Sequence, residues 1–175
     1  DKVAESAGRT GGLSLLRVTC PGSDEILWEP FTSAQHLTDE VARTLYKDVA
    51  GTALVFEEVR ADLGLRMRVT WQTGSRFGIV RTCELTNTGD NECEVELHEG
   101  FVNVLPAGVD QDTQNRLINL LDAYKRSESD ARSGLGMFWL SSRLTDLAEP
   151  SESLYANVVW HVGLGDVEHL VSTRQ

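Results

Sequence analysis

Two alternating segments joined by a polar turn constrain the fold of this chain more than any other feature. Residues 81–97 alternate apolar and polar side chains on both sides of the turn Thr88-Gly89-Asp90-Asn91. A period of two places successive side chains on opposite faces of a strand. The run therefore predicts a β-hairpin with one buried and one solvated face. The side chains predicted to point inward are Ile79, Cys83 and Leu85 on the first strand and Cys93, Val95, Leu97 and Phe101 on the second.

The composition is that of one acidic globular domain. A chain of 175 residues is long enough to bury roughly 70% of its unfolded surface in a single core. It carries 27 Asp and Glu against 16 Lys and Arg, a net charge of −11, and this excess opposes binding to nucleic acid and docking on anionic membranes. No apolar run approaches the roughly 20 residues that span a bilayer. We therefore expect a water-soluble protein with no nucleic-acid partner and no membrane partner.

The three cysteines allow at most one disulfide bond. Cys20, Cys83 and Cys93 show no Cys-x-x-Cys spacing, so neither a disulfide framework nor a zinc knuckle is indicated. Cys83 and Cys93 share the inward face of the predicted hairpin, which would let their thiols lie close together. Buried free thiols are nevertheless the expected state, because most buried cysteines behave as small hydrophobic residues. The compartment stays open, and the start at Asp1 without a signal-peptide pattern fits an excised segment of a longer protein.

Breaker residues divide the chain into closely spaced strands. We expect residues 1–12 to be a flexible lead-in, residues 13–166 to form a single β-sandwich domain and residues 167–175 to be a surface tail. Connections of hairpin length are typical of a sandwich or barrel, whereas a βαβ unit needs a longer crossover. The predicted fold is mostly β, an antiparallel, supersandwich-like β-sandwich with one or two short helices. The predicted strands are residues 13–18, 25–28, 53–59, 65–73, 77–86, 92–105, 134–142 and 154–164.

Two stretches leave the helix assignment open. Residues 38–43 can form one helical turn capped by Thr38, although Pro30 and the polar stretch after it favour a loop. In residues 110–126, apolar side chains recur at helical spacing, yet residues 118–124 also read as a buried strand.

The chain offers no motif for catalysis, for a cofactor or for a metal. Its histidines do not form the i, i+4 pair of a helical zinc site. No Gly-x-Ser-x-Gly elbow, phosphate-binding loop or dinucleotide fingerprint occurs. Glu84, Glu94 and Glu96 fall by parity on the solvated face of the predicted hairpin and receive no role. We therefore expect no catalytic residue, no cofactor and no metal. The histidines are His36, His98, His161 and His169.

Aromatic and amide side chains are the candidates for contacts with sugar. Each Trp lies in a strand-like segment, where its ring either fills the space between sheets or forms a flat platform for a sugar face. Residues 114–126 are rich in amide and charged groups, which can bind sugar hydroxyls, satisfy the backbone of a loop or meet a neighbouring domain. The candidate carbohydrate-binding residues are Trp71, Asn119, Asp122, Tyr124 and Trp139.

Two sequence elements resemble the N-terminal β-supersandwich of large carbohydrate-active proteins of the cellobiose-phosphorylase and glycoside-hydrolase type. The first is Arg81-Thr82-Cys83-Glu84-Leu85-Thr86-Asn87-Thr88-Gly89-Asp90, similar to that domain's strand and Asn-x-Gly-Asp turn, and the second is residues 115–124 followed by residues 134–142. The resemblance implies a galactose-mutarotase-like sheet architecture. It also implies a noncatalytic role, since in such proteins the chemistry sits in a separate (α/α)6 barrel. The resemblance favours a strand over residues 118–126.

Three functions are compatible with these observations. The expected one is a noncatalytic accessory β-sandwich domain excised from a larger carbohydrate-active protein, a glycoside phosphorylase or hydrolase. Such a domain packs on a neighbouring catalytic domain of the same polypeptide, contacts oligosaccharide, and exposes an apolar or aromatic patch. The alternatives are a freestanding mutarotase-like sugar epimerase, which needs a His and a Glu converging in an open cleft, and a purely structural or interaction β-sandwich.

Overall fold

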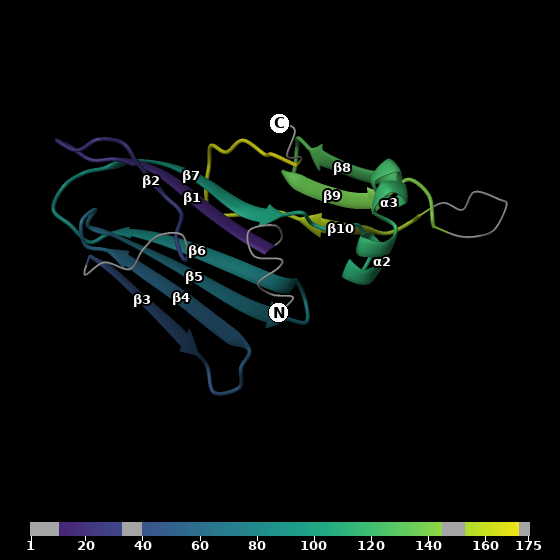
Figure 1. Ribbon diagram of the computed structural model, residues 1–175, viewed down its shortest axis with the longest axis horizontal. Coiled ribbons are helices and arrows are strands. Elements are labelled where there is room, and N and C mark those ends of the chain that lie inside the picture. The colour runs from purple at the N-terminus through teal and green to yellow at the C-terminus, as the bar shows by residue number, and fades with distance from the viewer. Residues whose placement is uncertain (1–10, 33–39, 145–152, 172–175) are drawn as a thin grey trace. The chain divides into compact units, whose positions relative to one another are not determined.

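The computed structural model describes residues 11–32, 40–144 and 153–171. They form a mostly β fold of antiparallel sheets with two short helices, as predicted. The chain divides into two compact units, residues 12–100 and residues 101–175, which we describe separately (Figure 1). The assignment of residues 13–166 to one domain stays a prediction. Among the described residues, no helix has the length and apolar character needed to cross a membrane.

Residues 12–100 form two sheets around one core. One sheet has four antiparallel strands in sequence order, so short hairpins join all of its neighbours. They are β3 (Val41–Lys47), β4 (Ala53–Arg60), β5 (Leu65–Gly74) and β6 (Gly78–Asn87). The other sheet has three strands in the order β2-β1-β7. They are β1 (Gly11–Thr19), β2 (Ile26–Trp28) and β7 (Glu94–Val102).

The core of this unit takes side chains from both sheets. Alternate positions of β1 and β5 are buried, as a strand with one dry face requires. Trp28 of β2 is fully buried among them. The buried apolar residues are Leu16, Val18, Trp28, Leu63, Leu65, Met67 and Val69.

The hairpin predicted over residues 81–97 is wrong, because β6 and β7 belong to different sheets. The alternation gave the inward residues near the turn correctly, because Cys83, Leu85, Cys93, Val95 and Leu97 pack against the core. It was wrong at the far ends of the two strands, where Ile79 is 65% exposed and Phe101 is 37% exposed. A buried face has the same period of two whichever strand lies next to it, so the pattern does not encode the pairing partner.

The connection between β6 and β7 is fixed by a close backbone approach. Thr88 N and Gly89 N donate to Gly64 O at 2.7 and 3.1 Å. Gly64 has φ +63°, and a Cβ built there would lie 3.0 Å from Gly89 Cα. A glycine in the β4–β5 turn and a glycine in the β6–β7 connection are therefore needed for this close approach.

The expectation of free thiols is wrong for two of the three cysteines, because Cys20 and Cys93 form a disulfide bond across 73 positions of the chain. Cys83 is the free cysteine. Its Sγ donates to Glu99 Oε1 at 3.0 Å. Glu99 lies within β7, six positions and about 20 Å of extended chain beyond Cys93, which precedes the strand. The proximity of Cys83 and Cys93 followed from the hairpin and fails with it.

Two strands of the structure are missing from the sequence prediction, β3 and β8. Residues 41–43, predicted as part of a helical turn, lie in β3, while Thr38 falls outside the described residues. The charged Arg43 occupies an inward position of β3, opposite Glu58 in the register. This charge interrupts the apolar alternation that would otherwise have revealed the strand.

Residues 101–175 contain a three-stranded antiparallel sheet in the order β10-β9-β8 and two short helices. The elements are α2 (Gln111–Arg116), α3 (Ile118–Tyr124), β8 (Lys125–Asp130), β9 (Leu135–Leu140) and β10 (Ala156–Val159). Asp110 caps α2, accepting from Thr113 N at 2.7 Å. The strand favoured over residues 118–126 is therefore wrong for residues 118–124, where helical spacing prevails. In the predicted surface tail, the His169 ring lies against Gly134.

Candidate functional site: two polar clusters between the sheets

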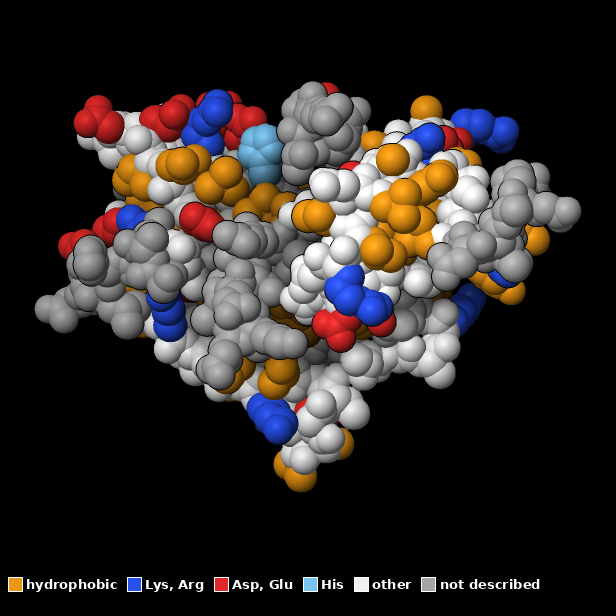
Figure 2. Space-filling model, turned by 45° about the vertical axis from the view of Figure 1, so that its right-hand side comes forward, with side chains coloured by type: hydrophobic (Ala, Val, Ile, Leu, Met, Phe, Trp, Pro, Cys, Tyr) orange, Lys and Arg blue, Asp and Glu red, His pale blue; other side chains and the backbone are white. Residues whose placement is uncertain are grey.

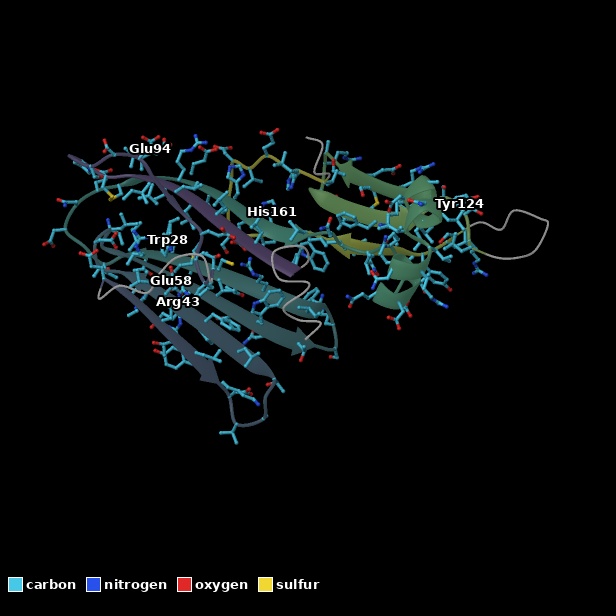
Figure 3. All side chains as sticks on the ribbon, viewed as in Figure 1. Trp28, Arg43, Glu58, Glu94, Tyr124 and His161 are labelled. Atoms are coloured by element: carbon cyan, nitrogen blue, oxygen red, sulfur yellow. A yellow bond between two sulfur atoms is a disulfide. The ribbon has the colours of Figure 1, made fainter. Side chains whose placement is uncertain are left out.

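Glu58 of β4 is the centre of the first polar cluster in the 12–100 unit. Although it carries a charge, its side chain is fully buried and lies opposite the buried Met67 of β5. Trp28 Nε1, Phe31 N and Arg43 Nε each donate to its carboxylate at 2.7 Å. Figure 3 labels Trp28, Arg43 and Glu58. A buried carboxylate is tolerated only when it is paired and hydrogen-bonded. This cluster therefore links β2 of one sheet to β3 and β4 of the other.

Arg43 completes the first cluster from the neighbouring strand. It faces Glu58 directly in the β3–β4 register, and its Nη2 donates to Thr32 O at 3.0 Å. The guanidinium therefore neutralises the carboxylate and also holds the backbone that follows β2. Because Glu58 accepts a hydrogen bond from each of three donors, its chemical role is to join the sheets.

The second cluster centres on Glu99 of β7. Arg81 of β6 forms an ion pair with its carboxylate, Ser14 Oγ of β1 donates to Glu99 Oε2 at 2.6 Å, and Cys83 Sγ donates to Oε1. Arg81 Nη2 also donates to Ser14 Oγ at 2.7 Å. The Arg81 side chain is only 7% exposed. Charge-assisted hydrogen bonds thus connect the two sheets at a second point.

The environment of Arg81 sets the protonation of this cluster. Its guanidinium lies 5.6 Å from the centre of the Trp71 ring, and a Cβ at Gly12 would come within 2.6 Å of Arg81 Nε. Burial lowers the pKa of the Arg81 guanidinium and raises the pKa of the Cys83 thiol, with the charge of Arg81 acting in the opposite direction. The thiol is therefore kept protonated and serves as a hydrogen-bond donor.

The predicted carbohydrate-binding residues occupy both units. Trp71 lies on the inward face of β5, packed partly buried against the core. Asn119 and Asp122 are exposed on α3, and Asp122 pairs with Lys125 Nζ at 2.9 Å. Tyr124 ends α3 half-buried, and Trp139 lies half-buried on β9. Three of the five therefore share one short helix, and a role for any of them in sugar binding stays a prediction.

The disulfide bond lies in an open surface depression of the 12–100 unit. Both bridged cysteines line it, and both are half-buried. Residues 19–23 form one wall of the depression and residues 92–94 the other.

Sequence reasoning missed every ionic residue of the two clusters. Three of them nevertheless occupy strand positions of the same parity as apolar residues that face the core. Glu58 has the parity of the inward Phe56 in β4, as the register with Val69 shows. Glu99 has the parity of Leu97 in β7, and Arg81 that of Cys83 in β6. A charge at an inward position of a strand requires a partner across the core. Inward parity therefore marked these charges as candidates for buried pairs, but it did not name their partners.

The described residues hold no group of three or more His, Cys, Asp or Glu side chains placed to bind a metal ion. His98 Nε2 lies 3.4 Å from Glu96 Oε1, and both side chains are about half exposed. Neither His98 nor Glu96 lines the surface depression at the disulfide bond.

No protein-family model matches the chain, and no curated protein matches it. The antiparallel β architecture is established by the structure, and the resemblance to a mutarotase-like supersandwich stays a prediction.

Proposed function

We propose that this chain is a noncatalytic accessory β-sandwich domain of a larger carbohydrate-active protein. In this proposal, residues 101–175 pack on a neighbouring domain of the same polypeptide and contact oligosaccharide. The observation that carries the proposal is the excess of exposed over buried apolar side chains in this unit.

Among the described residues of 101–175, two large apolar side chains are buried, Leu121 and Leu140, and twelve are exposed. Monomeric proteins rarely expose contiguous apolar surface of this kind unless a partner covers it. Figure 2 shows hydrophobic side chains gathered in patches on the face that it presents. The exposed residues are Phe101, Leu117, Ile118, Leu120, Leu154, Tyr155, Val158, Trp160, Val162, Leu164, Val167 and Leu170.

The noncatalytic role is supported by the occupation of the carboxylates inside the sandwich. Glu58 and Glu99 each accept hydrogen bonds from three different residues. A general acid or base must exchange its proton with a substrate within hydrogen-bond reach. Groups engaged in this way stabilise the fold instead.

The sugar contact is supported by the side chains around Trp139. Its cross-strand neighbours are Arg126 on β8 and Ala156 on β10. A half-buried ring beside a small residue and a cation is the kind of surface on which a sugar face stacks. The exposed Asn119 on α3 adds an amide that can donate and accept hydrogen bonds.

Hydroxyl-radical footprinting tests the packing part of the proposal. We expect labelling of Tyr155 and Trp160 to fall severalfold in the intact parent polypeptide relative to the chain alone, because the neighbouring domain covers them. Phe77, which is 53% exposed in the other unit, serves as the internal control. Equal labelling of Tyr155 and Trp160 in both samples would refute packing.

A fluorescence titration with gluco- and galacto-configured oligosaccharides tests the sugar contact. We expect a saturable change in Trp emission that Trp139→Ala abolishes. Phe138→Ala is the matched control, because successive residues of a strand point to opposite faces. A flat response to the whole panel would leave a structural domain without a sugar ligand.

A further inference from the structure

The disulfide bond lies in an open surface depression that is also lined by carboxylate side chains. Cys20 follows β1 and Cys93 precedes β7, so the bond joins the end of one strand to the start of its neighbour in the three-stranded sheet. Both cysteines line an open depression. The bond therefore lies at the edge of the core, open to this depression.

The rim of the depression is made of a tight turn and two carboxylates. Ser23 N and Ser23 Oγ both donate to Cys20 O, at 3.2 and 3.0 Å, which fixes the turn after β1. On the other side, Glu92 and Glu94 flank Cys93 directly, and both are exposed (Figure 3 labels Glu94). Two carboxylates and both bridged cysteines thus line the same depression.

Among the described residues, no ion pair neutralises Glu92 or Glu94. The nearest cation along β1 is Arg17, which lies 2.9 Å from Glu96 and 3.7 Å from Glu25 and is engaged with both. Asp24 and Asp90 lie close to the two walls in sequence and add further negative charge. Charges within about 10 Å interact strongly at low ionic strength.

We propose that the Cys20–Cys93 bond is a thiol-exchange site that selects its reactant by charge. It reacts with cationic and neutral thiols and resists anionic thiols such as glutathione. The site is independent of the proposed accessory function, because it depends only on residues of the 12–100 unit.

The exchange proceeds by attack of a thiolate on one sulfur of the bond. The S–S bond breaks, its electron pair leaves with the second sulfur, and that thiolate takes a proton from water. A second thiol then attacks the mixed disulfide, so the protein gains two thiols and the reductant is oxidised to its own disulfide. The attacking species carries one more negative charge than its thiol. The carboxylate rim therefore penalises a thiolate that is already anionic most strongly.

The free thiol of the unit does not compete in this reaction. Cys83 hydrogen-bonds Glu99, far along β7 from Cys93, and burial raises its pKa. A thiol count with Ellman's reagent in denaturant therefore reports the exchange directly: one free thiol per chain before reduction and three after it.

The test compares rates of reduction of the folded chain by cysteamine, 2-mercaptoethanol and glutathione. Each rate is divided by the rate of the same thiol with 2-hydroxyethyl disulfide, which removes differences in intrinsic reactivity. At low ionic strength we expect the normalised rate with cysteamine to be roughly tenfold higher than that with glutathione. In about 1 M salt we expect the two normalised rates to become nearly equal.

Substitutions locate the source of the selectivity. The double variant Glu92→Gln/Glu94→Gln should lose most of the charge discrimination. Glu128→Gln, which removes an exposed carboxylate from β8, should retain it. A normalised ratio near unity at low salt, a ratio unchanged in the double variant, or three free thiols in the untreated chain would each overturn the proposal.

Discussion

The two units of this chain differ in how they keep apolar surface away from water. The 12–100 unit has seven buried apolar residues, two polar clusters that join its sheets and a disulfide bond. Among its described residues, the 101–175 unit buries two large apolar side chains and exposes twelve. Because burial of apolar area is the dominant favourable term in folding, the first unit contains the source of its own stability. Under the proposed function, the second unit gains stability from the neighbouring domain that covers it.

The polar clusters add a further distinction. Buried ion pairs contribute little net stability compared with apolar packing, but the loss of one partner is strongly destabilising. The sandwich therefore depends on the completeness of each cluster. No equivalent buried pair occurs in the described part of 101–175, where the Asp122–Lys125 pair is exposed.

The largest effect is expected from removal of the central carboxylate. Glu58→Ala leaves the Arg43 guanidinium and the Trp28 Nε1 hydrogen without their acceptor, so we expect a loss of about 3–5 kcal/mol in the free energy of unfolding. Urea denaturation followed by Trp fluorescence measures it. Glu84→Ala, at an exposed position of β6, should change the free energy by less than about 1 kcal/mol. Equal losses in the two variants would contradict the role of the cluster.

The disulfide bond should rank second. Cys20→Ser/Cys93→Ser opens a loop that spans 73 positions, and the chain entropy regained by the unfolded state should cost about 3–4 kcal/mol. Thermal unfolding followed by circular dichroism at 218 nm measures this loss as a lower Tm. Cys83→Ser removes a thiol but no cross-link and is the matched control. A Tm that does not fall in the double variant would show that the bond does not stabilise the fold.

A smaller effect is expected from a single methyl group. Gly12→Ala places a Cβ within 2.6 Å of Arg81 Nε and 2.9 Å of the Trp71 ring, so the second cluster must shift, at about 1–3 kcal/mol. Gly74→Ala is the control, because nothing lies within 4 Å of its added Cβ and its φ is not positive. Chemical denaturation of both variants gives the comparison. A Gly12→Ala variant as stable as Gly74→Ala would refute the close packing of Arg81 on β1.

Both the inward alternation and the antiparallel β class could be predicted from the sequence. The residues of β6 and β7 that face the core follow a period of two, and that period survives whichever sheet a strand joins. The pairing was not predictable from the same pattern, because it depends on the contact between Gly64 and Gly89, far apart in sequence. The disulfide was missed for the same reason, since Cys20 becomes a neighbour of Cys93 only when β7 lies beside β1.

The candidate site was less predictable than the fold. Trp71 was selected for its ring, but the structure places Arg81 over that ring, a contact between two strands. Glu58, Arg81 and Glu99 resembled ordinary surface charges in a chain with many carboxylates. Their inward parity was the available signal, and it becomes decisive only when partners across the core are known.

The smallest effect concerns the acid sensitivity of the 12–100 unit. Arg60 Nε and Nη2 donate to the two carboxylate oxygens of Asp62 at 2.8 and 2.5 Å, which holds the pKa of Asp62 below its ordinary value of 3.8. The pair therefore stabilises the fold fully above that value, and its contribution is lost as the pH falls through the lowered pKa. We expect Asp62→Asn to lower stability by less than about 1 kcal/mol at pH 7, and the difference from the unsubstituted chain to shrink as the pH falls below 3.8. Urea denaturation between pH 2 and pH 7 measures it. A constant difference over that range would contradict the pairing.

Amide hydrogen exchange of the chain, read by mass spectrometry, tests the contrast between the units most directly. We predict that peptides from β4 and β5 exchange through global opening, whereas peptides from α3 and β9 exchange roughly 100-fold faster through local opening of the 101–175 unit. Equal protection of the two sets would show that the 101–175 unit is stable without a partner, and would contradict the account.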